Sequence, residues 1–223
     1  MILALAAAAI VFATVAPPAN PCDGQVQCHE FGHADVTGDG AVDRIGYRLI
    51  GYDEDRPFGP VTLRVVVTAS GGGRYVYNAR HRLPFQGPYG AAAIDGVPGA
   101  EIALSWLRGA HTDGIEIITF RDGRLLREKG WVRDAVATYG VGVEWIPGES
   151  PSSPIMRRCA YEDVPIGDKP STRTTTIDFT WHGDQWVKGP ATTADYPPER
   201  PIPWQCSRFA VPGMSRFPMN VFR

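Results

Sequence analysis

After residue 20 the chain alternates short runs of β-forming residues with turns centred on Gly, Asp or Pro, and this spacing limits the possible folds most strongly. Such spacing is typical of antiparallel all-β proteins. The 25 Gly and 20 Pro residues exclude a coiled coil or a helical bundle, while 43% hydrophobic residues indicate a folded chain. The predicted strands are residues 44–51, 61–69, 74–79, 101–106, 114–120, 124–129, 133–139, 142–146, 156–163, 172–181 and 185–188.

The sequence also contains weak internal repeats. AAAIDGVPGAEIALS at residues 91–105 resembles HADVTGDGAVDRIGY at residues 33–47, and the hairpin at 115–128 resembles the one at 175–189. We expect three degenerate units of roughly 50 to 65 residues, each with an opening loop, a strand and a hairpin. Three blades are too few for a closed propeller. The predicted fold is therefore all-β, with antiparallel hairpin repeats that are partial β-propeller-like or form a curled sandwich or barrel.

The N-terminus carries an unbroken apolar run at residues 2–16. The run is shorter than the roughly 20 residues that span a bilayer, but it fits the core of a signal peptide. We expect residues 1–19 to be a signal peptide cleaved after Ala19, with a retained N-terminal membrane anchor as the alternative. Both interpretations place the protein outside the cytoplasm, secreted or associated with the cell envelope.

The four cysteines support export. An even number of cysteines after a signal peptide predicts two disulfides, and three pairings are possible. We favour Cys22–Cys28, which closes a short loop, and Cys159–Cys206, which holds the C-terminal segment. The domain organisation is then a β-rich domain at 20–190 and a Pro-rich tail at 191–223 packed on it.

Residues 35–43 read DVTGDGAVD and carry an oxygen atom at nearly every second position. Calcium takes six to eight oxygen ligands, and the glycines allow the loop to curl around an ion. The candidate ligands are the side chains of Asp35, Thr37, Asp39 and Asp43 and the backbone carbonyl of Ala41. The alternative is a loop of Asx turns that binds nothing.

The segment ADVTGDGAVDRIGY resembles the FG-GAP (VCBS-type) repeat of integrin-like propellers, whose blades open with D-x-[DNT]-G-D-G-x-x-D loops. The resemblance implies a structural calcium ion in a β-loop-β turn, held by the five residues above. A second, degenerate copy at residues 95–101 has lost most of these ligands. The layout is also similar to that of small secreted actinobacterial proteins. FG-GAP-like modules serve in adhesion, sugar binding and purely structural roles, so the resemblance implies no activity.

HEFGH at residues 29–33 matches the H-E-x-x-H motif, in which a helix presents two zinc-binding histidines and a general base. Gly32 inside the motif and the missing third ligand argue against a zinc peptidase. An extracellular hydrolase remains the alternative function, through this motif or through a glycosidase carboxylate pair. The candidate carboxylates are Glu144, Glu149, Glu162 and Asp163.

The net charge of −2 and the pI near 6.2 argue against a nucleic-acid partner. We expect a secreted or cell-envelope, non-catalytic binding or scaffold module with a structural calcium loop. Its partner would be an envelope protein or a glycan. We expect no membrane span beyond the possible N-terminal anchor.

Overall fold

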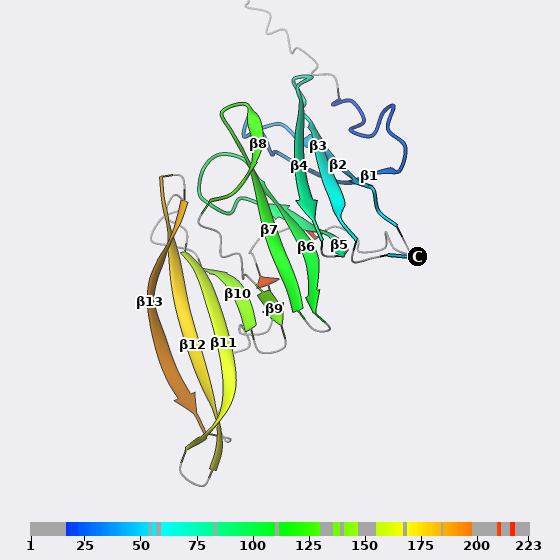
Figure 1. Cartoon of the computed structure of the whole chain (residues 1–223). Helices are drawn as coiled ribbons and strands as arrows, with labels where there is room; N and C mark the ends of the chain where they lie inside the picture. Colours follow the sequence, from blue (N-terminus) through cyan, green and yellow to red (C-terminus); the bar gives the residue numbers. More distant parts are fainter. Residues whose placement is uncertain are drawn as a thin grey trace, which may run out of the picture.

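The structure is a computed structural model of the whole chain (Figure 1). It describes residues 17–53, 55–56, 59–82, 84–109, 112–129, 136–138, 141–146, 155–166, 169–183, 185–197, 209–210 and 215–216. The apolar run at 2–16 and Cys206 lie outside the described residues, as does most of the Pro-rich tail.

Every regular element in the described residues is a β-strand, and the strands form two sheets. One is four-stranded with the order β1-β2-β3-β4, and the other is 11-stranded with the order β13-β12-β11-β10-β9-β7-β6-β5-β15. Strand β8 pairs with β7, and β14 pairs with β10. In the described part of the chain neither sheet closes into a barrel, and the predicted all-β class with antiparallel hairpins is confirmed. The strands are β1 (Cys28–Ala34), β2 (Asp43–Ile50), β3 (Val61–Thr68), β4 (Arg74–His81), β5 (Phe85–Ala92), β6 (Glu101–Gly109), β7 (Thr112–Arg121), β8 (Arg124–Arg127), β9 (Val136–Thr138), β10 (Val141–Ile146), β11 (Ile155–Ile166), β12 (Lys169–His182), β13 (Gln185–Tyr196), β14 (Phe209–Ala210) and β15 (Ser215–Arg216).

Most of these strands belong to three antiparallel meanders, in which each strand pairs with the next one along the chain. Unit 1 is β1-β2-β3-β4, unit 2 is β5-β6-β7-β8 and unit 3 is β10-β11-β12-β13. The short strand β9 pairs with both β7 and β10 and so joins units 2 and 3 into one sheet. A four-stranded antiparallel meander is the architecture of a propeller blade.

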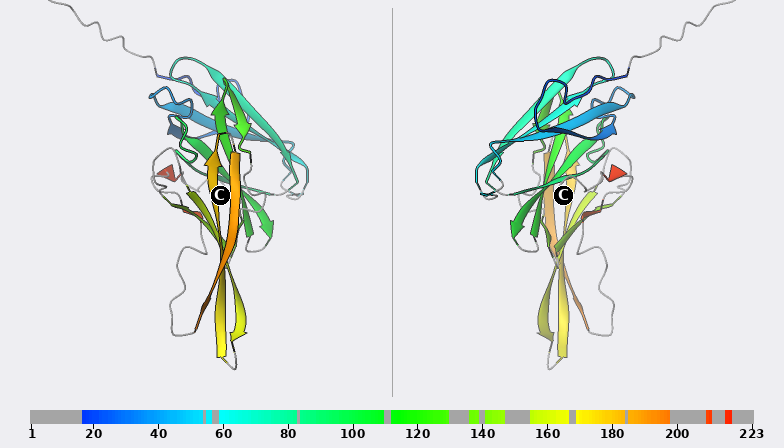
Figure 2. Two further views of the ribbon diagram at one scale, coloured as in Figure 1. Left: turned by 90° about the vertical axis from the view of Figure 1, so that its left-hand side faces the viewer. Right: turned by 90° about the vertical axis from the view of Figure 1, so that its right-hand side faces the viewer.

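Unit 2 lies between the other two units, as Figures 1 and 2 show. Its central strand β6 is buried on both faces. Leu104 and Trp106 pack into the core shared with unit 1, while Ala103 packs into the core shared with unit 3. A strand covered on both sides needs apolar residues at successive positions, which explains the run Ile102-Ala103-Leu104 in β6. In unit 1, β4 alternates exposed and half-buried residues because only one of its faces is covered.

The strands differ from the predicted ones most clearly at β1, β5 and β13, and the two-residue strands β14 and β15 in the predicted tail were not predicted either. Strands β1 and β5 were not predicted, since both contain glycine and β5 also contains Pro88. Register shifts accommodate these residues, between Glu30 and Gly32 in β1 and at two points in β5. Strand β13 was predicted to end at 188 but continues to Tyr196, into the segment assigned to the tail. Its extension pairs with the threonine-rich half of β12, whose β-branched residues favour strands.

The segment before β1 packs against the outer face of unit 1. The Arg44 guanidinium donates a hydrogen bond to the Pro18 carbonyl (3.2 Å), and the Thr68 hydroxyl donates to the Ala19 carbonyl (2.5 Å).

The predicted Cys22–Cys28 disulfide is present in this segment and is confirmed. Cys159 is also disulfide-bonded, but its predicted partner lies outside the described residues. The described ranges contain no helix of the length and apolarity needed to cross a membrane.

Candidate functional site

The loop at residues 35–43 connects β1 to β2 and is organised by the carboxylate of Asp35. One Asp35 oxygen accepts hydrogen bonds from the amides of Gly38 (2.7 Å) and Asp39 (3.1 Å), and the other accepts from Gly40 (2.9 Å). Gly38 and Gly40 have positive φ angles of 75° and 83°. The glycines of the motif thus permit the tight curl, and Asp35 holds it closed.

Asp43 ties the end of this loop to two other segments and is completely buried. Its Oδ2 accepts hydrogen bonds from the amides of Val36 and Thr37, both at 2.9 Å, and its Oδ1 accepts from the amide of Ser70 (3.2 Å). Ser70 belongs to the turn between β3 and β4, so one buried carboxylate joins the loop to the neighbouring turn at the same end of unit 1. Three amide donors occupy three of the roughly four acceptor positions of this carboxylate.

The remaining candidate ligands lie closer to solvent. Asp39 is exposed and accepts hydrogen bonds from the Ala41 amide (2.8 Å) and the Ser70 hydroxyl (3.3 Å). The Thr37 Oγ1 atom is shielded from solvent and has no hydrogen-bond partner among the described residues. All five predicted ligands therefore belong to one curled loop. Over the described part of the chain, no three acidic, histidine or cysteine side chains are grouped as a metal site would need.

The loop at residues 93–101 is the structural counterpart of the loop at 35–43. In each loop a buried carboxylate accepts a hydrogen bond from the amide seven residues earlier: Asp43 from Val36 (2.9 Å) and Glu101 from Ile94 (2.5 Å). Val36 and Ile94 are both 1% exposed, and Asp43 and Glu101 are both 0% exposed. When residues 33–47 are aligned with residues 91–105, Val36 matches Ile94 and Asp43 matches Glu101.

The two loops pack directly against each other and bring units 1 and 2 together. The Ala100 amide donates a hydrogen bond to the Asp35 carbonyl (2.6 Å). A Cβ atom placed on Gly38 would lie 2.6 Å from the Pro98 carbonyl oxygen, and one on Gly99 would lie 2.8 Å from that of Val36. Both glycines have positive φ and leave no room for a side chain, so the contact between the loops requires glycine on each side.

The loop at 93–101 holds a protein cation, which sequence reasoning did not find. The Arg121 guanidinium, from the end of β7, contacts the carboxylates of Asp95 and Glu101. Asp95 occupies the position of Thr37 in the first loop. The repeat of residues 33–47 at 91–105 identified the loop, but nothing in the local sequence connects it to an arginine 20 residues after Glu101.

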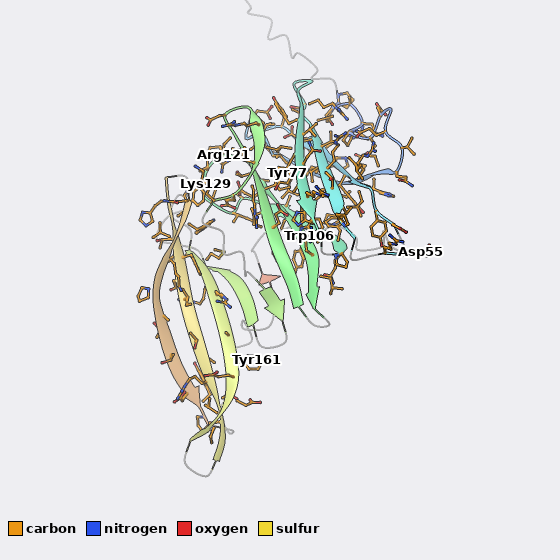
Figure 3. The ribbon with its side chains drawn as sticks, viewed as in Figure 1. Asp55, Tyr77, Trp106, Arg121, Lys129 and Tyr161 are labelled. Atoms are coloured by element: carbon orange, nitrogen blue, oxygen red, sulfur yellow. A yellow bond between two sulfur atoms is a disulfide. The ribbon has the colours of Figure 1, made fainter. Side chains whose placement is uncertain are left out.

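A second polar cluster connects unit 1 to unit 2 around Glu116 of β7, which is 2% exposed. Its carboxylate accepts hydrogen bonds from the Tyr77 hydroxyl (2.6 Å) and the Trp106 indole (3.1 Å), and His81 Nε2 lies 3.0 Å away. His81 stacks on Trp106 with ring centroids 3.6 Å apart. Figure 3 labels Tyr77 and Trp106 at this junction. Burial raises the pKa of Glu116, but the donors His81 and Tyr77 outweigh burial and hold the pKa below its ordinary value.

The HEFGH motif forms part of strand β1, so it lacks the helix that a zinc peptidase requires. Glu30, the residue in the place of the general base, is bound by the Arg44 guanidinium at 2.7 Å and 2.5 Å. This hydrogen bonding lowers the pKa of Glu30. His33 Nε2 lies 3.1 Å from Glu30 Oε1. The motif thus contributes to the surface of unit 1.

Of the candidate glycosidase carboxylates, the structure describes the side chains of Glu162 and Asp163. Glu162 and Asp163 are consecutive residues of β11 and therefore point to opposite faces of the sheet. Glu144 pairs by backbone register with Arg157, but its side chain is outside the described part of the structure. Glu149 lies outside the described residues.

No family model, curated protein or solved structure matches the chain. The FG-GAP resemblance therefore depends on the motif at residues 34–47.

Proposed function

We propose that this protein is a secreted or envelope-associated binding or scaffold module without catalytic function, in which the loop at 35–43 binds a structural calcium ion in the manner of FG-GAP repeats. The observation that carries the proposal is the position of this loop, which is built around buried Asp43 and packed on its counterpart in unit 2. An ion bound there would stabilise the junction between two units.

The chemistry of the loop suits calcium. Asp35, Asp39 and Asp43 place three carboxylates within nine residues, and calcium prefers carboxylate, hydroxyl and carbonyl oxygens. The Thr37 hydroxyl is shielded without a partner in the described part of the chain, so a cation would supply the interaction that it lacks. The Ala41 carbonyl would complete the set.

The counterpart loop supports the need for a cation at this position. There the Arg121 guanidinium, a single positive charge, contacts the carboxylates of both Asp95 and Glu101. The loop at 35–43 contains three aspartates. A metal ion bound there would supply the positive charge that Arg121 supplies to the other loop.

The buried acidic residues support a structural role for this module. Asp43 is bound by three backbone amides, and Glu116 holds Tyr77 of β4 and Trp106 of β6 together. Carboxylates engaged in this way stabilise the packing of units. We therefore assign recognition to the surface of the module, where an envelope protein or a glycan would bind.

Export is supported by the Cys22–Cys28 disulfide, because disulfides persist in oxidising compartments. The bond fixes the N-terminal segment that covers the outer face of unit 1. A module whose N-terminal segment is held by a disulfide suits a scaffold outside the cell.

Thermal unfolding with and without calcium tests the proposal. Chelator should lower the Tm, and millimolar calcium should restore it, while magnesium should do so poorly. A ligand at one hundred times its Kd stabilises the folded protein by about 2.7 kcal/mol. Asp39→Ala should abolish the response to calcium, and Asp55→Ala, which alters an exposed aspartate outside the loop, should leave it intact.

Equilibrium dialysis with radioactive calcium then gives the stoichiometry, which should be one ion per chain in the wild type and in Asp55→Ala. Identical melting curves in chelator and in calcium, together with no retained calcium, would reduce the loop to a set of Asx turns and refute the metal site.

A further inference from the structure

Three carboxyl groups are buried where unit 2 meets unit 3. Asp95 lies in the loop before β6, Glu101 begins β6, and Glu128 follows β8. Asp95 and Glu101 are 0% exposed and Glu128 is 4% exposed. Carboxylates at this depth need a compensating cation or a proton, because burial of an uncompensated ion costs several kcal/mol.

The described residues around the cluster supply one bound cation. The Arg121 guanidinium contacts Asp95 and Glu101. Glu128 is held by a different group: its Oε1 accepts a hydrogen bond from the Trp186 indole (2.6 Å), while its Oε2 is buried without a partner in the described part of the chain. Among the contacts of the described residues, one guanidinium can therefore balance only one of these three carboxylates.

Glu128 is located at the connection to β13 of unit 3. Its amide bonds to the Ile117 carbonyl of β7 (3.0 Å), which fixes it to unit 2. The next residue, Lys129, forms a parallel bridge with Gln185, and the Trp186 amide bonds to the Lys129 carbonyl (3.3 Å). Figure 3 labels Arg121 and Lys129 at this end of the molecule. The Glu128 side chain and the Lys129 backbone thus both bind Trp186 at the start of β13.

We propose that Asp95, Glu101 and Glu128 form a proton-operated latch, in which protons bound by Glu101 and Glu128 hold β13 on unit 2 and their loss loosens this seam. With two protons in the cluster, the single positive charge of Arg121 balances the single remaining carboxylate. Without them, two uncompensated charges would lie under β13 beside the Trp186 indole.

The surroundings of both groups favour the protonated form. Burial and the nearby charge of Asp95 raise the pKa of Glu101 to about 7. Burial, followed by the charges of Glu101 and Asp95, raises the pKa of Glu128 well above its ordinary value. The opposing influences are the Ile94 amide and Arg121 on Glu101, and Trp186 and Arg121 on Glu128.

Among the described residues, the charged groups that act on Glu128 are Glu101 from β6, Asp95 from the loop before it and Arg121 from β7. Strand β13 contributes the uncharged indole of Trp186. Lys129 follows on the same segment, with its backbone bonded to β13. The carboxylates outnumber Arg121 at the buried end of Glu128, so negative charge dominates there.

The sign of the pH dependence follows from these directions. Both groups bind protons more tightly in the folded chain than in the unfolded chain. Their contribution to stability is therefore complete below the ordinary carboxyl pKa of 4.5 and is lost as the pH rises through the folded values, near 7 for Glu101 and higher than 4.5 for Glu128. The seam should open as the solution becomes neutral to alkaline.

Hydrogen exchange at several pH values, corrected for intrinsic exchange rates, tests the latch in the mature protein at constant calcium. Amides of β13 should lose protection about tenfold per pH unit for each proton released, and amides of β2 should not. Glu128→Gln keeps an acceptor for the Trp186 indole but cannot ionise, so the slope for β13 should decrease. Glu116→Gln is the matched control, since the pKa of Glu116 is lowered and its loss should leave the alkaline slope of β13 unchanged.

Infrared spectroscopy provides a second readout that needs no comparison of stabilities. The wild type at pH 6 should show a protonated carboxyl band that weakens in Glu128→Gln. The latch is refuted if that band is absent, or if wild type and Glu128→Gln lose protection in β13 equally as the pH rises. A pH response that disappears on addition of calcium or magnesium would also overturn it, because the cluster would then bind a cation in place of protons.

Discussion

The contact between the loops at 35–43 and 93–101 can be tested by a single methyl group. Gly38→Ala places a Cβ atom 2.6 Å from the Pro98 carbonyl oxygen, at a φ of +75°. Gly40→Ala is the matched control, because Gly40 has a similar φ of +83° but no atom within 4 Å of the added Cβ. The two variants therefore share the backbone strain and differ in the contact with the second loop.

The expected free energies of unfolding follow from these two contributions. An alanine in the left-handed conformation destabilises the folded state by about 1–2 kcal/mol. Alanine also lowers the conformational entropy of the unfolded chain, which offsets about 0.4–1 kcal/mol of this loss. Gly40→Ala should therefore destabilise by about 1 kcal/mol. The overlap in Gly38→Ala adds about 1–3 kcal/mol, as is usual when a packed contact is overfilled.

Urea unfolding followed by circular dichroism measures both values. Gly99→Ala, which meets the Val36 carbonyl at 2.8 Å, should behave like Gly38→Ala. The double variant should be less destabilised than the sum, because either substitution alone already separates the loops. If Gly38→Ala and Gly40→Ala differ by less than about 0.5 kcal/mol, the reasoning is refuted, because the loops would not be in tight contact.

Three further predictions concern the connections between elements. Since the pKa of Glu116 is held below its ordinary 4.5, its contribution to stability is present above pH 4.5 and is lost as the pH falls. Glu116→Gln should therefore flatten the acid side of a Tm against pH curve, and an unchanged acid side would contradict the network. Tyr77→Phe removes one hydrogen bond to this buried carboxylate and should destabilise by about 1.5–3 kcal/mol in urea unfolding, with a loss under 0.5 kcal/mol counting against the bond. Replacing Cys22 and Cys28 together by serine should cost about 2 kcal/mol, because the closed loop is short, and equal Tm values for variant and wild type would argue that the bond does not form.

Much of the fold could be predicted from the sequence because the information is local. Alternating apolar residues and turn glycines lie within a few residues of one another, so the strands of the hairpins at 115–128 and 175–189 were expected near their observed positions. The curl of the loop at 35–43 was likewise expected from its aspartates and glycines. The Cys22–Cys28 disulfide was also expected from local sequence, since the two cysteines are six positions apart.

Other elements exist only because distant strands pair with them. The sequence FQGPYGAA of β5 has little intrinsic preference for a strand, but pairing with β6, with two register shifts, stabilises it. Strand β13 extends to Tyr196 because β12 offers a long row of pairing partners. In both cases the stabilising free energy comes from pairing with another strand and from burial, and neither can be read from the local sequence of the strand.

The sequence by itself determined which residues curl into loops, which segments form hairpins and which apolar side chains must be covered. Only the tertiary structure decided that Arg121 meets Asp95 and Glu101, that Glu116 receives Tyr77 and Trp106, and that Glu128 lies beneath β13. The physical reason is that these contacts join side chains from different strands, and for Tyr77 and Trp186 from different units, so the partners are set by how the strands pair and the sheets pack. The ionisation of a buried carboxyl depends on those partners, so its chemistry could be known only once the units were in place.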